Sequence, residues 1–539
     1  MTNPFRKSAL VTAVLCVCFE IVGCSPPPID ESKINGVTAQ RTEADEVSTL
    51  LSALRAETLG FVDGTDVTVR QLNRWAESSD SVTSLLGGTS GDVSTTRFSA
   101  ADARHVRDRL LDAEVVESLI ADTPGDVDRL RKLFAHVCRH VERVGSDATP
   151  RTTFEVRLIG RGTAAERAWL FCDLVRQLKL EAALLVPGDD VAAPERGGPF
   201  VVAVFAGGEA YLFDPAAGLA VPAGRDDAAA VPEDVVPVTF RDVLADPTLL
   251  AFADATSDES WNADSLRASR LLTVETAADG RPVIDAFESM LPPDVTAVLF
   301  DPPESSSAGP GLNERLADAA RAAGLGDAGL TRWDYPDRRI AAFDAAGGRQ
   351  AQGLRIAMLP FEAPLGEEGE PLREQLAARL DQLRGRGREA SKVFQLVRVD
   401  GSATSLRATK DLSANQRTMY RLAADDAHYW TAVCQYAVGN DRAVISTAAS
   451  YAKAGGPRAA AAEALRALAE ARSGLTAEAA TRAVALVEAG RADAGLGWLA
   501  TRWSTPASAE DDGDRDDETV AEENVADDSP ADIDAGDAT

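Results

Sequence analysis

The sequence is poor in the residues that most often carry catalysis or cross-links. Its 539 residues include only four histidines and six cysteines. Three cysteines, up to Cys24, belong to an N-terminal targeting segment, which leaves Cys138, Cys172 and Cys434. An odd number of cysteines in an oxidising compartment argues against a disulfide framework, with a single pair as the alternative. We expect buried single thiols.

Several nucleotide-binding and hydrolase motifs are missing. The chain has no P-loop, no dinucleotide-type glycine motif beside a strand and no Gly-x-Ser-x-Gly nucleophile elbow. The run Arg384-Gly-Arg-Gly-Arg follows a charged helical segment and lacks the context of a phosphate loop. These absences argue against nucleotide-dependent and α/β-hydrolase chemistry, and no cofactor is expected.

Positive charge is scarce, because the formal net charge is −30. Residues 507–539 alone hold fourteen acidic residues, one arginine and almost no apolar side chains. This composition is typical of a disordered, solubilising tail, with calcium or cationic-surface binding as the alternative. Acidity of this degree argues against nucleic acid as a partner.

The N-terminus has the pattern of a secretory signal. The basic pair Arg6-Lys7 precedes an apolar run over residues 9–22, which is too short for a comfortable membrane span. The run ends in Ile-Val-Gly-Cys24, which resembles a bacterial lipobox and implies a lipid on Cys24. Ser25 then implies the periplasmic face of the outer membrane. An ordinary signal or an uncleaved anchor is the alternative.

The most informative stretch covers residues 158–187. Thr163 and Glu166 form a capping box, which predicts a helix that begins at Ala164. A strand end and a glycine turn are expected before this helix, and a strand after it. Its apolar side chains share one face, namely Ala164, Ala168, Phe171, Cys172, Val175 and Leu178.

Helices are expected before this stretch and a hairpin after it. Residues 100–111 and 126–144 have helical patterning, and the second segment carries an apolar stripe that ends at Val144. Two apolar runs flank Gly207-Gly208, which predicts a hairpin whose second strand ends at Asp214.

These features, over roughly residues 100–225, resemble the transglutaminase-like superfamily, which has a papain-like fold. In that family a Gly-x-Cys turn opens the helix, a later strand carries His, and the next strand ends in Asp-Pro. Gly162-Thr163-Ala164 and Phe213-Asp214-Pro215 occupy these places. The resemblance implies that Ala164 stands at the nucleophile position and that Pro199 or Phe200 stands near the His position. Only Asp214 is retained.

The family's chemistry is therefore not expected here. An aspartate that orients an imidazole has no catalytic use without one. Cys172 lies eight residues beyond Ala164, which is about 12 Å along a helix, on the apolar face. Burial there raises a thiol pKa and suppresses reactivity.

A binding cleft near the former nucleophile position remains a hypothesis. The groups that would border it are Arg161, Thr163, Glu166, Arg167, Trp169 and Asp214. Their alternative role is helix capping and strand–helix packing.

Two histidines have the spacing of paired metal ligands. His136 and His140 stand four residues apart on one predicted helix, but no glutamate or third ligand completes a zinc motif. We expect solvated or edge histidines and no metal. His105 and His428 have no partner that the sequence identifies.

The C-terminal half is expected to be helical. Alanine-rich amphipathic segments cover residues 425–438, 441–454, 458–472 and 476–489. Gly439 and Gly474 are 35 residues apart, close to the tetratricopeptide period of about 34 residues. Because two pairs are few for a free array, these helices should also pack on the rest of the protein. Concave peptide binding and plain packing are both open.

The sequence thus predicts an α+β protein with a transglutaminase-like domain, a small α/β region and a tetratricopeptide-like helical domain. Strands are expected at 270–276 and 295–301, and a helix at 312–323. The expected divisions are a signal (1–24), a tether (25–60), the transglutaminase-like domain (61–250), the small region (251–345), the helical domain (346–504) and the acidic tail (505–539).

The predicted function is a non-catalytic envelope lipoprotein that serves as a scaffold for a protein, peptide or cell-wall partner. One alternative is an active cysteine hydrolase or transglutaminase with a relocated thiol and histidine. Another is a structural envelope protein with no ligand.

Overall fold

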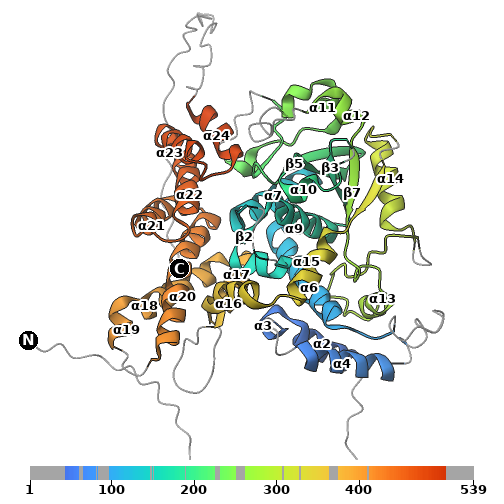
Figure 1. Ribbon diagram of the computed structural model, residues 1–539, viewed down its shortest axis with the longest axis horizontal. Coiled ribbons are helices and arrows are strands. Elements are labelled where there is room, and N and C mark those ends of the chain that lie inside the picture. Colours follow the sequence, from blue (N-terminus) through green and yellow to red (C-terminus); the bar gives the residue numbers. More distant parts are fainter. Residues whose placement is uncertain are drawn as a thin grey trace, which may run out of the picture.

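A six-stranded sheet lies at the centre of the larger part of the molecule (Figure 1). Its order is β6-β5-β4-β3-β7-β8, and every pairing is antiparallel except the parallel β7–β8 pair. The strands are β3 (Glu181–Val186), β4 (Val201–Ala206), β5 (Glu209–Asp214), β6 (Leu219–Ala220), β7 (Arg270–Val274) and β8 (Leu330–Trp333). The computed structural model describes residues 43–59, 65–79, 82, 96–145, 149, 151–188, 190–224, 231–250, 261–305, 309–326, 329–362, 374–408 and 412–504.

The predicted hairpin is present as β4 and β5. Gly207 and Gly208 join the strands with φ angles of +59° and +82°. Two consecutive positive φ values match the twist that a two-residue hairpin turn requires, and glycine adopts them without a steric penalty. Asp214 ends β5, as expected.

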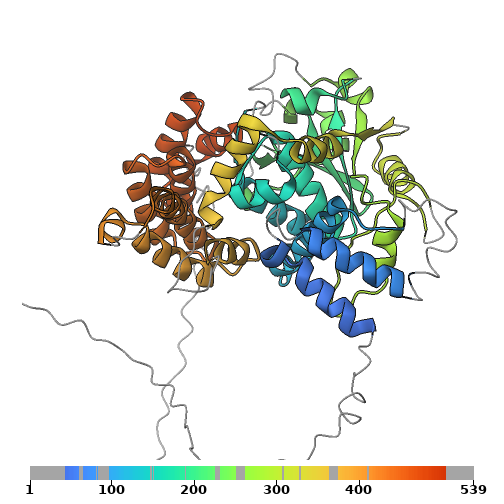
Figure 2. The same ribbon diagram turned by 60° about the horizontal axis from the view of Figure 1, so that its bottom comes forward.

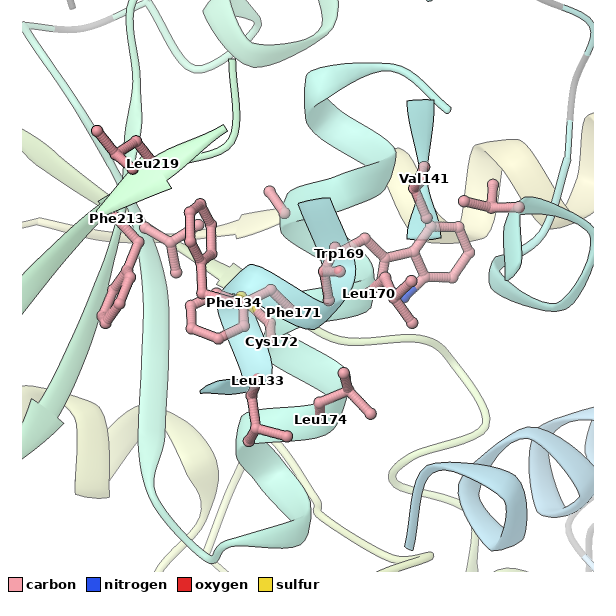
Figure 3. Close-up of a cluster of buried hydrophobic side chains, with 14 of the residues drawn as sticks. Leu133, Phe134, Val141, Trp169, Leu170, Phe171, Cys172, Leu174, Phe213 and Leu219 are labelled. Carbon is pink, nitrogen blue, oxygen red and sulfur yellow. The ribbon is translucent and has the colours of Figure 1, made fainter. Parts of the chain in front are cut away.

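Helices cover both faces of the sheet. On one face lie α7 (Asp126–His140) and α9 (Ala164–Gln177), and on the other α11 (Phe240–Ala245) and α14 (Leu312–Ala322). Alternate residues of β3 point to opposite faces, so Leu184 joins the first core and Leu185 the second. Figure 3 shows three aromatic rings of the first core together, with centroids 5.0–5.1 Å apart, from Phe134, Phe171 and Phe213.

The region predicted as a separate small α/β unit belongs to this sheet, so the boundary at residue 250 is wrong. β3 pairs with β4 along one edge and with β7 along the other, and β7 in turn pairs with β8. Buried ion pairs add to the attachment: Arg176 of α9 donates to Asp301 at 2.8 Å. Arg109 bridges Asp173 at 2.7 Å and Asp279 at 2.8 Å.

Three local predictions were also wrong. Residues 153–159 form helix α8 (Thr153–Ile159) rather than a strand end, because Thr152 and Glu155 make a second capping box. Helix α7 ends at His140, so Val144 lies beyond it, and β1 (Glu142–Arg143) pairs with β2 (Arg161–Gly162). Residues 295–301 form no strand; Gln177 binds both the N–H and the C=O of Val298.

The end of the predicted tether is folded. Helices α2 (Glu43–Leu54), α3 (Ala56–Leu59) and α4 (Thr65–Ser78) lie below the sheet region in Figure 1, against α6 (Ala100–Ile120) and α13 (Pro282–Glu288). Val47 and Leu54 are fully buried there. The tether prediction is therefore wrong for residues 43–59. The predictions for residues 1–42, including the lipid on Cys24, and for the acidic tail concern residues outside the described part of the chain.

An array of helices flanks the sheet region in both views (Figures 1 and 2). The four predicted segments are present within α20 (Ala414–Ala437), α21 (Asp441–Lys453), α22 (Ala459–Arg472) and α23 (Thr476–Glu488). The array also contains α17 (Glu374–Leu383), α18 (Gly387–Asp400), α19 (Ala403–Ala408) and α24 (Ala494–Ser504). As expected, it packs on the rest of the protein, since Leu486 and Leu499 share a core with Val141 and Leu219.

Four further helices complete the described fold. They are α10 (Ala193–Arg196), α12 (Ala263–Arg267), α15 (Tyr335–Asp344) and α16 (Gly348–Glu362), with single 3₁₀ turns at Pro232–Asp234 and Pro247–Leu250. Among the described residues, no helix has the length and apolar content needed to cross a membrane.

The junction between the sheet region and the array is built on the C-terminus of α8. A helix leaves its last carbonyl groups without internal donors. Arg379 of α17 donates to the carbonyl groups of Arg157 and Leu158, and Arg458, just before α22, donates to those of Ile159 and Gly160. Both guanidinium groups lie over the ring of Trp430, at 3.6 Å and 4.9 Å.

This junction has room only for glycine at position 160. Gly160 has a φ of +65°, and a Cβ there would lie 2.4 Å from the Trp430 ring. We expect Gly160→Ala to lower the free energy of unfolding by about 3 kcal/mol or more, because left-handed strain adds to a steric clash. Urea unfolding measures this loss.

Gly188→Ala is the matched control. Gly188 has nearly the same φ, +63°, but nothing lies within 4 Å of its added Cβ. It should cost only the conformational strain of about 1–2 kcal/mol. Equal losses in the two variants would contradict the proposed contact with Trp430.

Candidate functional site

The N-terminus of α9 begins as predicted, but it does not open onto a cleft. Thr163 Oγ1 accepts from the Glu166 N–H at 3.1 Å, and Glu166 accepts from the Thr163 N–H at 2.8 Å. Helix α15 covers this cap. Its Arg339 pairs with Glu166, which is fully buried, and its Tyr335 hydrogen-bonds the Thr163 side chain. The positive end of the helix dipole therefore meets an internal carboxylate.

The predicted cleft residues do not line one common cavity. Arg161 binds Glu142 and the Pro457 carbonyl. Trp169 faces α6 and α15 on the opposite side from Arg167. The cleft hypothesis is therefore wrong in this form, and the contacts seen are those of capping and packing.

Asp214 works as a turn cap. Its carboxylate accepts from the backbone N–H groups of Ala216 and Ala217, both at 2.8 Å. Burial raises the pKa of Asp214 to about 6, although these hydrogen bonds oppose the shift. Both donors are backbone groups of alanine residues. The residue keeps its place at the end of β5 and has a structural role there.

The histidines of α7 are buried, so the expectation of solvated or edge side chains was wrong. The rings of His136 and His140 lie 4.0 Å apart, and His140 Nδ1 contacts the His136 carbonyl oxygen at 2.9 Å. Burial lowers the pKa of His136 to about 3 and that of His140 well below its usual value. Both are neutral at pH 7. In the described part of the chain, no group of three His, Cys, Asp or Glu side chains is arranged to hold a metal.

The three thiols of the described residues are unpaired and unreactive in their surroundings. Cys172 and Cys434 are buried and Cys138 is partly buried, and no disulfide joins them. Burial raises the pKa of each thiol to about 12. The thiolate is the nucleophilic form of cysteine, and burial disfavours it at all three positions.

A cavity of about 380 Å³ lies between the sheet region and the helical array. We call it the interdomain cavity. The sheet region contributes α7, β1, α9 and the turn before β6, and the array contributes α20, α22, α24 and the turn after α23. Its charged side chains are Arg139, Glu142, Arg143, Arg167, Arg491 and Asp493.

Asp493 ties the two walls of the interdomain cavity together. It accepts from Arg143 Nε and from Arg167 Nη1, both at 2.7 Å. Burial alone would raise the pKa of Asp493, but Arg167 and Arg143 hold it below its usual value. Arg167 also donates to the carbonyl groups of Val141 and Pro215. No local sequence pattern identifies Asp493, because its partners lie more than 300 residues away.

Comparisons with protein-family models, with curated proteins and with solved structures found no match. The resemblance to transglutaminase-like domains therefore rests on the residues of this chain.

Removing the carboxylate of Asp493 should destabilise the protein at neutral pH. We expect Asp493→Asn to lower the free energy of unfolding by roughly 2 kcal/mol, since two arginines lose their shared partner. A lowered folded-state pKa means that the carboxylate stabilises the fold above its unfolded pKa of about 4 and loses this effect as the pH falls through the folded pKa. Urea unfolding of both proteins at pH 7 and near pH 3 should therefore show a smaller difference at the lower pH.

Asp318→Asn serves as the control for this comparison. Asp318 forms an exposed ion pair with Arg321 on α14, with both side chains at least 60% exposed. Its removal should change stability by less than about 0.5 kcal/mol. A loss at Asp493 no larger than this would refute the bridging role.

Proposed function

We propose that the protein is a non-catalytic lipoprotein of the cell envelope. In this proposal a degenerate transglutaminase-like domain and tetratricopeptide-like helices form a scaffold for a protein, peptide or cell-wall partner. The observation that carries the proposal is the state of the nucleophile position. Ala164 stands there without a thiol, and the cap beside it is occupied by Glu166, Arg339 and Tyr335.

The alternative of a relocated cysteine nucleophile has little support. It requires a thiolate next to an imidazole. Cys172 is 3% exposed and lies in the apolar core around α9. The two histidines of α7 are buried, and the His140 ring contacts the backbone carbonyl of His136. A scaffold needs neither group.

The array also supports a binding role through its outer surface. Its inner helices α20, α22 and α24 face the chain's own sheet region across the interdomain cavity. Because the inner face of the array already packs toward the sheet region, a partner that binds the array's outer face fits the fold better than a peptide bound on its concave face. On α18, Leu396 and Val399 lie one turn apart and are 60% and 62% exposed, so they form a small apolar patch on one face of the helix. We propose that they contact the partner, and that Cys24 anchors the scaffold at the periplasmic face of the outer membrane.

A thiol-reactive probe separates this proposal from a cysteine enzyme. On the native full-length chain at pH 7.5, we expect peptide mass spectrometry to find Cys138, Cys172 and Cys434 unmodified after brief exposure to a maleimide. The same residues should react in urea, because unfolding removes the burial that raises their pKa values. Rapid labelling of one native thiol, lost near pH 5, would refute the non-catalytic proposal.

Partner capture tests the scaffold itself. The full-length protein, cross-linked in envelope membranes, should recover a specific partner, and Leu396→Gln combined with Val399→Gln should reduce recovery at least about tenfold, the scale of losing apolar contact residues. Point substitutions are preferable to removing α20–α24, because that deletion would open the shared core.

Val484→Gln provides the matched control. Val484 lies on α23 and is 42% exposed, so it tests a similar substitution elsewhere on the array. It should leave recovery unchanged. Equal losses in the two proteins, or no specific partner with either, would contradict a contact through α18.

A further inference from the structure

The interdomain cavity has an excess of positive charge in a strongly acidic protein. Four of its six charged side chains are arginines, whereas the whole chain has a formal net charge of −30. The carboxylates are shared. Asp493 serves both Arg143 and Arg167, and Glu142 serves two arginines outside the cavity's own set. The local field therefore favours an anion.

One of the cavity's arginines is free for a ligand. Arg491 lies on the turn after α23, is exposed, and pairs with no carboxylate in the described part of the chain. Arg139, across the cavity, is held by Glu233 and lies over the ring of Tyr436. An anionic group near Arg491 would gain a charge-assisted hydrogen bond without breaking an existing ion pair.

The array's wall of the cavity is largely apolar beside Arg491. It consists of small and branched side chains of α22 and α24, namely Ala460, Ala461, Ala464, Leu468, Leu496 and Leu499. Tyr429 of α20 completes it. Tyr429 is 4% exposed and borders the cavity. Its hydroxyl can donate a hydrogen bond to a ligand oxygen there.

We propose that the interdomain cavity binds a small amphiphilic organic anion. Its anionic head lies at Arg491, and its short apolar body lies along α22 and α24. The cavity volume of about 380 Å³ suits such a molecule. An inorganic anion would leave the apolar wall unused. This inference goes beyond the proposed scaffold function, because it requires neither the partner nor the membrane.

The probe is 8-anilinonaphthalene-1-sulfonate, whose fluorescence rises in apolar sites. Titrated into the full-length native protein, it should saturate at one molecule per chain. Uncharged N-phenyl-1-naphthylamine, which has the same ring system without the sulfonate, should bind at least about tenfold more weakly, as expected for a lost charge-assisted hydrogen bond. Octanoate should displace the sulfonate, and inorganic phosphate at the same concentration should not.

Two substitutions locate the site. Ala464→Leu places a larger side chain in the cavity and should abolish saturable binding, whereas Ala449→Leu, at a partly buried alanine of α21 outside the cavity, should not. Arg491→Gln should weaken binding about tenfold, and Arg491→Lys should retain most of it. Because Arg491 is exposed, these variants test the proposal even if Ala464→Leu does not fold.

Three results would overturn the proposal. The first is unchanged binding in both folded Ala464→Leu and Arg491→Gln. The second is equal affinity for the charged and uncharged probes. The third is displacement by phosphate alone, which would assign a simple anion site instead. The partner-capture result does not affect these measurements, so the two proposals fail separately.

Discussion

Two arginines of the helical array, Arg379 and Arg458, donate hydrogen bonds to the last carbonyl groups of α8 in the sheet region. The packing of the two regions against each other depends on these bonds. Helix α8 is seven residues long and buried, so its last carbonyl groups have neither intrahelical donors nor water. Arg379 and Arg458 supply those donors from the array. Burial, together with the charge of Arg458, lowers the pKa of Arg379 to about 9, which leaves it protonated at neutral pH. The buried carbonyl groups of the sheet region therefore have hydrogen-bond donors only when the array is packed against it.

Internal partners also hold the polar groups around the N-terminus of α9 and the end of β5. Each ionised or polar group there has an internal partner that fixes it. Glu166 holds the α9 cap and Arg339, Asp214 holds a turn, and Asp493 holds two arginines. A catalytic group needs an unsatisfied position facing substrate. In the interdomain cavity, by contrast, Arg491 is exposed and forms no ion pair with another described residue.

Local signals predicted much of the fold. The α9 capping box, the glycine hairpin turn and the C-terminal helices each depend on residues close in the sequence, and each is present. Helix α8 was missed although Thr152 and Glu155 have capping-box spacing, because Phe154, Val156 and Leu158 alternate as in a strand. The cavity could not be predicted, since Asp493 meets Arg143 and Arg167 only after the whole chain has folded back. The same holds for β7 beside β3.

The bridge at Asp493 also has a consequence for the order of events in synthesis. The walls that it joins are separated by more than 300 residues, so the ribosome releases the second wall long after the first. Contacts this distant in sequence form late, because the intervening chain must be ordered first. Until the C-terminal helices have been synthesised, the α8 carbonyl groups lack part of their hydrogen-bond donors and α22 lacks part of its packing partners. The polypeptide therefore stays incompletely packed until its C-terminal helices have been synthesised.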